Sequence, residues 1–234
     1  MRRRLGVTLA VAVMLLAAGP GHADPPRSPV PLKLADARIV LFPPSVAVYK
    51  IGAGGQPALK PDWTEAARGH VASALEAAFA AGRATIVPYE APEIAERRAA
   101  HIQVTKVHML VAQTIVRHEY GDDKFRLPSM AGRFDWSVGP GAAVIREDSG
   151  DADYALFVEF IEGHTSGGRV AMNVAAAVLG GSIVTGAHTG VASLVDLRTG
   201  DVVWFHRNRQ KGGDLRTPEA ARRSVGALLQ GLPF

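Results

Sequence analysis

An apolar run of eight residues, Tyr154 to Ile161, constrains the fold of this chain more than any other feature of its sequence. It consists mainly of aromatic and aliphatic residues that favour strands, and Glu159 is its one charged residue. Strands that are apolar on both faces lie centrally in sheets covered by other elements. The run therefore predicts a sheet with helices packed against it.

Helix and strand patterns alternate along the rest of the chain. Asp62 and Glu65 have capping-box spacing, and Thr217 followed by Pro218 is typical of a helix start. Thr199-Gly200 supplies the turn of a hairpin. Strands are expected over 38–42, 46–51, 84–88, 154–161, 191–195 and 202–205, and helices over 62–81, 92–118, 170–179 and 217–231, with a short one ending near 148. The fold class expected is α/β (α+β): one domain over 36–234, with a mixed β-sheet packed with helices and a late antiparallel β-hairpin.

The first 23 residues predict a secretory signal peptide. Three arginines precede the apolar segment Leu5–Ala18, and Gly21-His22-Ala23 places small residues where a signal peptidase cleaves. Cleavage after Ala23 would place the protein in the periplasm. The chain has no cysteine, so it is not expected to be a lipoprotein. Residues 24–35 are expected to form a proline-rich linker.

The net charge argues against a nucleic-acid partner. The chain has 26 basic and 22 acidic residues, and cleavage after Ala23 would remove three arginines and no acid, which leaves 23 against 22. The high isoelectric point therefore depends largely on the signal peptide, and the exported protein is almost charge-balanced.

No motif nominates a catalytic, cofactor-binding or metal-binding residue. His101 and His108 are seven positions apart on one predicted helix, roughly 10 Å along its axis, which is too far for two ligands of one zinc ion. The glycine-rich turn 52–55 lacks the lysine of a phosphate loop. The loop with His164 and Ser166 leaves one alternative open, a small-molecule-binding or hydrolytic protein, although a nucleophile elbow needs glycine where His164 stands.

The stretch from Val170 to Ala187 contains no charged residue. Its alanines, glycines and polar residues do not suit a membrane span, so it is expected to pack in the core, contact a partner or insert shallowly into a membrane. The candidate contact residues for a partner or membrane are Val170, Met172, Val174, Val178, Leu179, Ile183 and Val184. Arg207, Arg209 and Lys211 form a second candidate surface, which is basic and suits an acidic partner or phospholipid head groups. The alternative is that these basic residues only face solvent.

The order of elements resembles the periplasmic domain of the CsgG-like curli-secretion family and the N-terminal domain of TolB. The resemblance rests on the early strand before a capped helix, on the strand 154–161, and on the hairpin with Asp196-Leu197-Arg198-Thr199-Gly200. It implies an envelope accessory or assembly protein of a Gram-negative bacterium, without catalytic residues. The signal peptide, the lack of a catalytic constellation and the uncharged stretch 170–187 lead to the function expected: a non-enzymatic periplasmic protein that binds a protein partner in the cell envelope. Channel formation does not carry over, because the acylated cysteine is missing. The oligomeric state is left open.

Overall fold

The structure, a computed structural model, describes residues 25–28, 32, 34–52, 56–80, 82–130, 132–165, 187–211 and 213–233. The expected signal peptide therefore lies outside the described residues. The strands are β1 (Arg38–Leu41), β2 (Ser45–Ile51), β3 (Pro57–Leu59), β4 (Thr85–Pro88), β5 (Tyr154–Thr165), β6 (Ala187–Asp196) and β7 (Val202–Lys211). The helices are α1 (Pro61–Ala80), α2 (Ala95–Glu119), α3 (Ala143–Asp148) and α4 (Pro218–Leu228), together with 3-10 turns at Asp123–Phe125, Pro128–Met130 and Pro140–Ala142.

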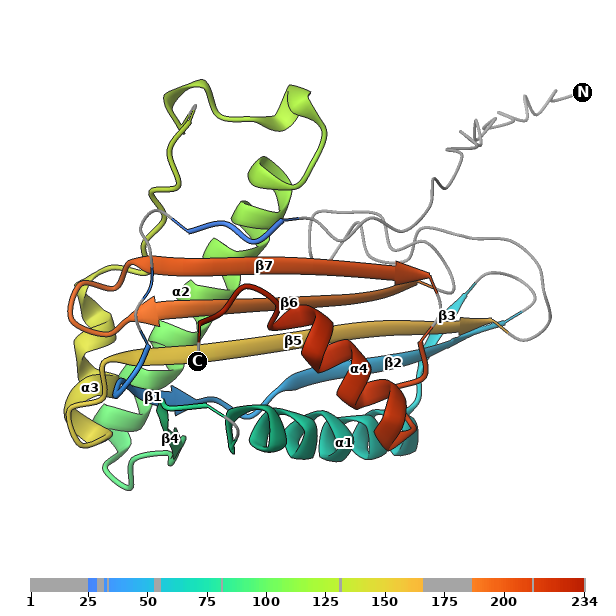
Figure 1. The fold of residues 1–234 in the computed structure, drawn as a ribbon, viewed down its shortest axis with the longest axis horizontal. Coiled ribbons are helices and arrows are strands. Elements are labelled where there is room, and N and C mark those ends of the chain that lie inside the picture. Colours follow the sequence, from blue (N-terminus) through green and yellow to red (C-terminus); the bar gives the residue numbers. More distant parts are fainter. Residues whose placement is uncertain are drawn as a thin grey trace, which may run out of the picture.

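Strand β5 is the centre of a seven-stranded mixed sheet. Along one edge it pairs in parallel with β1 and then with β2, which follow each other across the Pro43-Pro44 break. Along its other edge it pairs antiparallel with β6, which continues into β7 (Figure 1). The central position expected for 154–161 is confirmed, and the strand runs four residues further, to Thr165.

Helices cover both faces of this sheet. Helices α1 and α4 pack together on the near face in Figure 1, while α2 passes behind the strands. Two apolar cores result, one with Leu75, Phe160 and Trp204 and the other with Ile115 and Phe205. The neighbours Trp204 and Phe205 enter different cores because successive side chains of a strand point to opposite faces. The mixed α/β single domain expected from the sequence is confirmed.

Element boundaries differ from expectation by a few residues. Helix α2 begins at Ala95 rather than Pro92, and α4 ends at Leu228 rather than Gly231. Thr217 caps α4 as expected, because its side chain accepts a hydrogen bond from the Ala220 N–H. Gly200 adopts the left-handed conformation expected of the hairpin turn, with φ of 83°. The helix expected over 170–179 lies outside the described residues. Within those residues, no helix is long and apolar enough to cross a membrane.

Candidate functional site

A cluster of polar side chains gathers where β5 ends and β6 begins. We call it the Glu162 cluster and define it as Glu162, His164, His188 and Asp214. Glu162 and His164 are two residues apart on β5, so their side chains share one face of the sheet. His188 lies on β6 directly opposite Glu162. Asp214 comes from the connection between β7 and α4, which brings a distant part of the chain to this face.

Glu162 is at the centre of the cluster and its side chain is only 2% exposed. His164 Nε2 lies 3.4 Å from Glu162 Oε2, and His188 Nδ1 lies 3.6 Å from Glu162 Oε1. The backbone N–H of Leu215 donates a hydrogen bond of 3.0 Å to Oε2. His164 Nε2 is also 3.9 Å from Asp214 Oδ1. One carboxylate therefore contacts two imidazoles and a backbone amide.

The cluster holds Glu162 in its charged form. Burial by itself would raise the pKa of this carboxyl, but the imidazoles of His164 and His188 and the Leu215 N–H stabilise the anion and lower the pKa to about 2. Arg216 forms bonds of 2.6 and 2.7 Å to the two oxygens of Asp214 and lowers the pKa of that carboxyl as well. Both carboxylates are thus available to attract a proton donor or a cation at neutral pH.

Three buried atoms of the cluster have no hydrogen-bond partner among the residues that the structure describes: Glu162 Oε1, His164 Nε2 and His188 Nδ1. Their contacts of 3.4 to 3.6 Å lack hydrogen-bond geometry. A buried polar group without a hydrogen bond costs roughly 1–3 kcal/mol, so native proteins rarely retain several side by side. Such an arrangement is typical of a site that takes up a further group.

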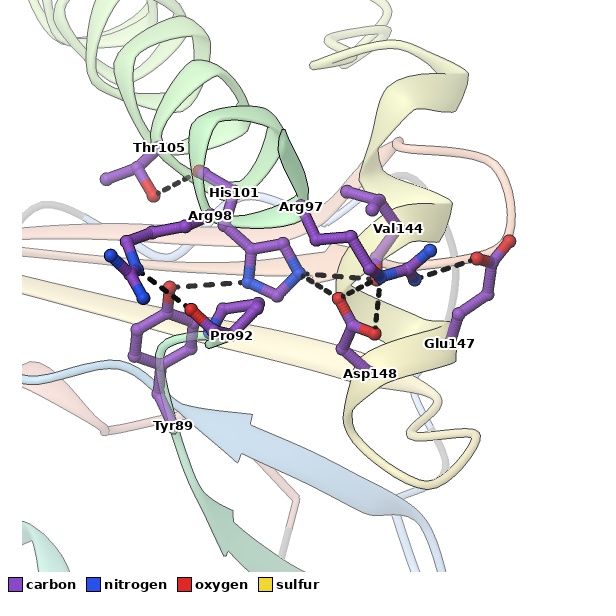
Figure 2. Close-up of polar contacts among 9 residues, drawn as sticks. All are labelled: Tyr89, Pro92, Arg97, Arg98, His101, Thr105, Val144, Glu147 and Asp148. Atoms are coloured by element: carbon purple, nitrogen blue, oxygen red, sulfur yellow. Dashed lines mark hydrogen bonds and ion pairs between the residues drawn. The ribbon is translucent and has the colours of Figure 1, made fainter. Parts of the chain in front are cut away.

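A different polar network lies on the other face, where it fixes α2 to α3 (Figure 2). His101 is completely buried, and its Nε2 lies 2.9 Å from Asp148 Oδ2 while its Nδ1 contacts the Tyr89 hydroxyl at 3.3 Å. The Arg97 guanidinium bonds Asp148 at 2.7 and 2.8 Å, and it lowers the pKa of that carboxyl. Both ring nitrogens of His101 have a nearby partner here, so the network is structural.

His108 is the second buried histidine of α2. Its ring stacks on Phe157 of β5 with 3.8 Å between the ring centroids, and its Nε2 contacts the Ser193 hydroxyl. Burial lowers the pKa of His108 to about 3, so the ring is neutral at physiological pH. His101 and His108 thus pack α2 on the sheet, whereas His118 is only half-buried.

Several of the candidate residues expected from the sequence lie outside the described residues. These are Val170, Met172, Val174, Val178, Leu179, Ile183 and Val184, together with Ser166 and the side chain of Lys211. Arg209 is half-buried. The prediction for Arg207 is wrong, because its side chain is buried and not part of an open basic surface. Arg207 is 8% exposed, and its guanidinium donates to the Tyr120 carbonyl and lies 5.0 Å from the Tyr120 ring.

The sequence interpretation named His164 but found no acid to pair with it, and it overlooked Glu162, His188 and Asp214. The sequence could have paired Glu162 with His164, because side chains two residues apart on a strand point to the same face. No sequence pattern could have predicted the position of Asp214, because only the tertiary fold brings it to β5.

Comparison with protein-family models and with curated proteins finds no match. Among solved structures, the PelC dodecamer from Paraburkholderia phytofirmans is 14% identical, covers 92% of this chain and all of its own, and has a TM-score of 0.38. The LpoB C-terminal domain from Salmonella enterica is 11% identical and has a TM-score of 0.29, and the match covers 77% of this chain and 85% of the LpoB domain. The lipoprotein GNA1162 from Neisseria meningitidis is 16% identical and has a TM-score of 0.30, and the match covers 74% of this chain and 81% of the lipoprotein.

These structural neighbours are bacterial envelope proteins. Their TM-scores all lie below 0.5, so nothing about the function of this chain follows from them. The resemblance to the CsgG-like and TolB families stays a prediction.

Proposed function

We propose that this protein is a non-enzymatic periplasmic accessory or assembly protein that binds another component of the bacterial envelope through helix α2. The observation that supports this proposal most strongly is a set of exposed apolar side chains on α2. We call it the α2 surface and define it as Ile102, Val107, Met109 and Leu110.

The α2 surface is unusual for a helix that already buries one face. Val104, Ala112 and Ile115 pack toward the sheet, as in any amphipathic helix. The opposite side would normally be polar, yet Leu110 is 60% exposed and Ile102 is 47% exposed. Four of the seven most exposed large apolar side chains among the described residues belong to α2. Exposed apolar side chains that cluster in this way are typical of interaction sites.

The charges around the α2 surface specify the chemistry of the partner. No acidic residue occurs between positions 97 and 118, while Lys106 and Arg117 are exposed on the helix. A complementary surface would be apolar at its centre and acidic at its rim. We therefore expect a protein partner with that pattern.

Recovery of the partner from envelope extracts tests the proposal. Leu110→Asp places a charge in the centre of the α2 surface, and its exposure means that the fold tolerates the change. Ser73→Asp adds the same charge at an exposed position of α1 and serves as the control. We expect Leu110→Asp to reduce recovery of the partner at least about tenfold relative to the wild type and the control, which corresponds to about 1.4 kcal/mol. Identical recovery by all three proteins would contradict the proposal.

The uncharged stretch 170–187 extends the proposal to a membrane or partner contact through Leu179 and Ile183. Liposome flotation of the wild type against Leu179→Asp and Ile183→Asp tests this part. A membrane contact predicts that both variants float less, and equal flotation of folded variants would remove it.

A hydrolytic function remains the second candidate, because His164 lies beside the acid Glu162. It would require Ser166 as the nucleophile. Labelling with a broad serine-hydrolase probe distinguishes the two, since hydrolysis predicts labelling that Ser166→Ala abolishes. No labelling is the result that our proposal expects.

A further inference from the structure

We infer that Glu162, His164 and Asp214 bind one divalent metal ion of the zinc class. The sequence alone nominated no metal ligand, and the inference does not depend on the partner proposed above. It rests on the geometry of the three donor atoms and on the unsatisfied buried atoms among them.

The three side chains offer ligand atoms that all lie within 4.8 Å of one another. His164 Nε2 is 3.4 Å from Glu162 Oε2 and 3.9 Å from Asp214 Oδ1. Zinc binds imidazole nitrogen and carboxylate oxygen at about 2.0–2.2 Å, so two of its ligands lie at most roughly 4 Å apart. Both His164 separations meet that limit. The Glu162 and Asp214 oxygens lie within 4.8 Å of each other, so a side-chain movement of less than about 1 Å would bring this pair within the limit as well. One imidazole with two carboxylates is also a donor set that zinc accepts.

Unsatisfied buried atoms supply the second, independent observation. Within the described part of the chain, the buried Nε2 of His164 has no hydrogen bond. The Glu162 side chain is 2% exposed, and its Oε1, which faces His188 Nδ1 at 3.6 Å, has none there either. A metal ion between these groups would bind His164 Nε2 directly and would balance the charge of the buried carboxylate. It would therefore remove the energetic cost that the arrangement otherwise carries.

Neighbouring groups hold the two proposed carboxylate ligands in place. Leu215 N–H donates to Glu162 Oε2, and His188 Nδ1 faces the other oxygen at 3.6 Å. Arg216 bonds both oxygens of Asp214, and its guanidinium stacks over the ring of Trp63 at 4.4 Å. Glu162 Oε2 accepts one hydrogen bond and keeps a lone pair for the ion. Asp214 Oδ1 already accepts two, because the Arg216 backbone N–H also donates to it at 3.2 Å, so coordination there would displace the longer of its bonds.

The site would join the end of β5 to the connection that leads into α4. Gly213 packs tightly here, because a methyl group at that position would lie 3.2 Å from His188 Nδ1 and 3.3 Å from Glu162 Oε1. A bound ion would fix β5 to this connection and would stabilise the folded state.

Zinc titration of the purified chain, free of any polyhistidine tag and dialysed against a chelator, tests the inference. Calorimetry with zinc chloride should show one ion bound per chain. Zinc at about 100 times its dissociation constant should raise the melting temperature by roughly 5–10 °C. His164→Ala removes a ligand that is 20% exposed, and we expect it to weaken binding at least about 100-fold. His70→Ala removes an imidazole from α1 and should bind as the wild type does.

Absence of zinc binding by the wild type would overturn the inference, and so would equal affinity of the wild type and His164→Ala. If His164→Ala fails to fold, His164→Asn provides the second variant. Melting temperatures without zinc separate misfolding from loss of the ligand. A drop in zinc affinity with an unchanged zinc-free melting temperature supports the metal site.

Discussion

At the scale of single residues, the buried His108 links the stability of this protein to pH. His108 is neutral in the folded state because it is enclosed by α2, Phe157 and Ser193. In the unfolded chain its ring would titrate near 6.5. The unfolded state therefore binds more protons than the folded state between about pH 6.5 and pH 3.

This difference predicts a loss of stability as the pH falls through that window. Since the pKa of the folded state is the lower one, the free energy of unfolding should fall by about 1.6 kcal/mol between pH 6.5 and pH 5.0. His108→Gln removes the titrating ring, so its stability should change by much less over the same interval. Urea denaturation of both proteins at the two pH values measures this. Parallel losses in the two proteins would show that His108 is not responsible.

Gly190 provides a second prediction at this scale. A methyl group there would lie 2.5 Å from the ring of Phe160, which is buried and cannot move away freely. Gly190→Ala should therefore destabilise the protein by about 1–3 kcal/mol. Gly226 in α4 has open space around its Cβ position, so Gly226→Ala is the matched control and should stabilise the protein by about 0.5–1 kcal/mol. Thermal unfolding of the two variants distinguishes these opposite signs.

At the scale of elements, helix α2 both packs on the sheet and carries the proposed partner surface. One side packs on the sheet, and the network of His101, Arg97 and Asp148 fixes its first turns to α3 (Figure 2). The other side presents the α2 surface. The position of this surface is therefore set by polar bonds at one end of the helix and by the apolar core along its length.

Removal of Asp148 tests how strongly this network holds α2. Asp148→Ala leaves the buried imidazole of His101 without its carboxylate partner, and we expect a loss of about 1–3 kcal/mol in stability. Glu147→Ala removes only an exposed contact to Arg97 and should cost less than about 0.5 kcal/mol. Chemical denaturation compares the two. Equal losses would mean that the buried histidine does not need Asp148.

Sequence patterns predicted the elements well where the signal was local. The apolar run 154–161, the Thr199-Gly200 turn and the Thr217 cap depend on neighbouring residues alone, and the structure contains all three. The Glu162 cluster depends on three segments that meet only in the folded chain. Arg207 was misread because nothing in its local sequence shows that Tyr120, 87 positions away, would accept its hydrogen bond and stack with it.

At the scale of the whole molecule, a sheet covered on both faces follows a segment that the sequence predicts to be a signal peptide. The sequence predicts cleavage after Ala23, which would leave a chain that begins at Asp24. N-terminal sequencing of the protein from the periplasmic fraction should therefore read Asp-Pro-Pro-Arg. A retained arginine-rich terminus would contradict export by this route.

Site-specific photo-crosslinking in intact cells tests most directly whether the protein binds an envelope partner through the α2 surface. A photo-reactive residue at position 110 should give one discrete crosslinked product. The mass added to the chain should be that of the partner and should differ from the mass of a second copy of the chain. The same residue at position 73 on α1 should give no such product. Product at neither position, equal product at both, or a product of two copies of this chain would contradict the claim.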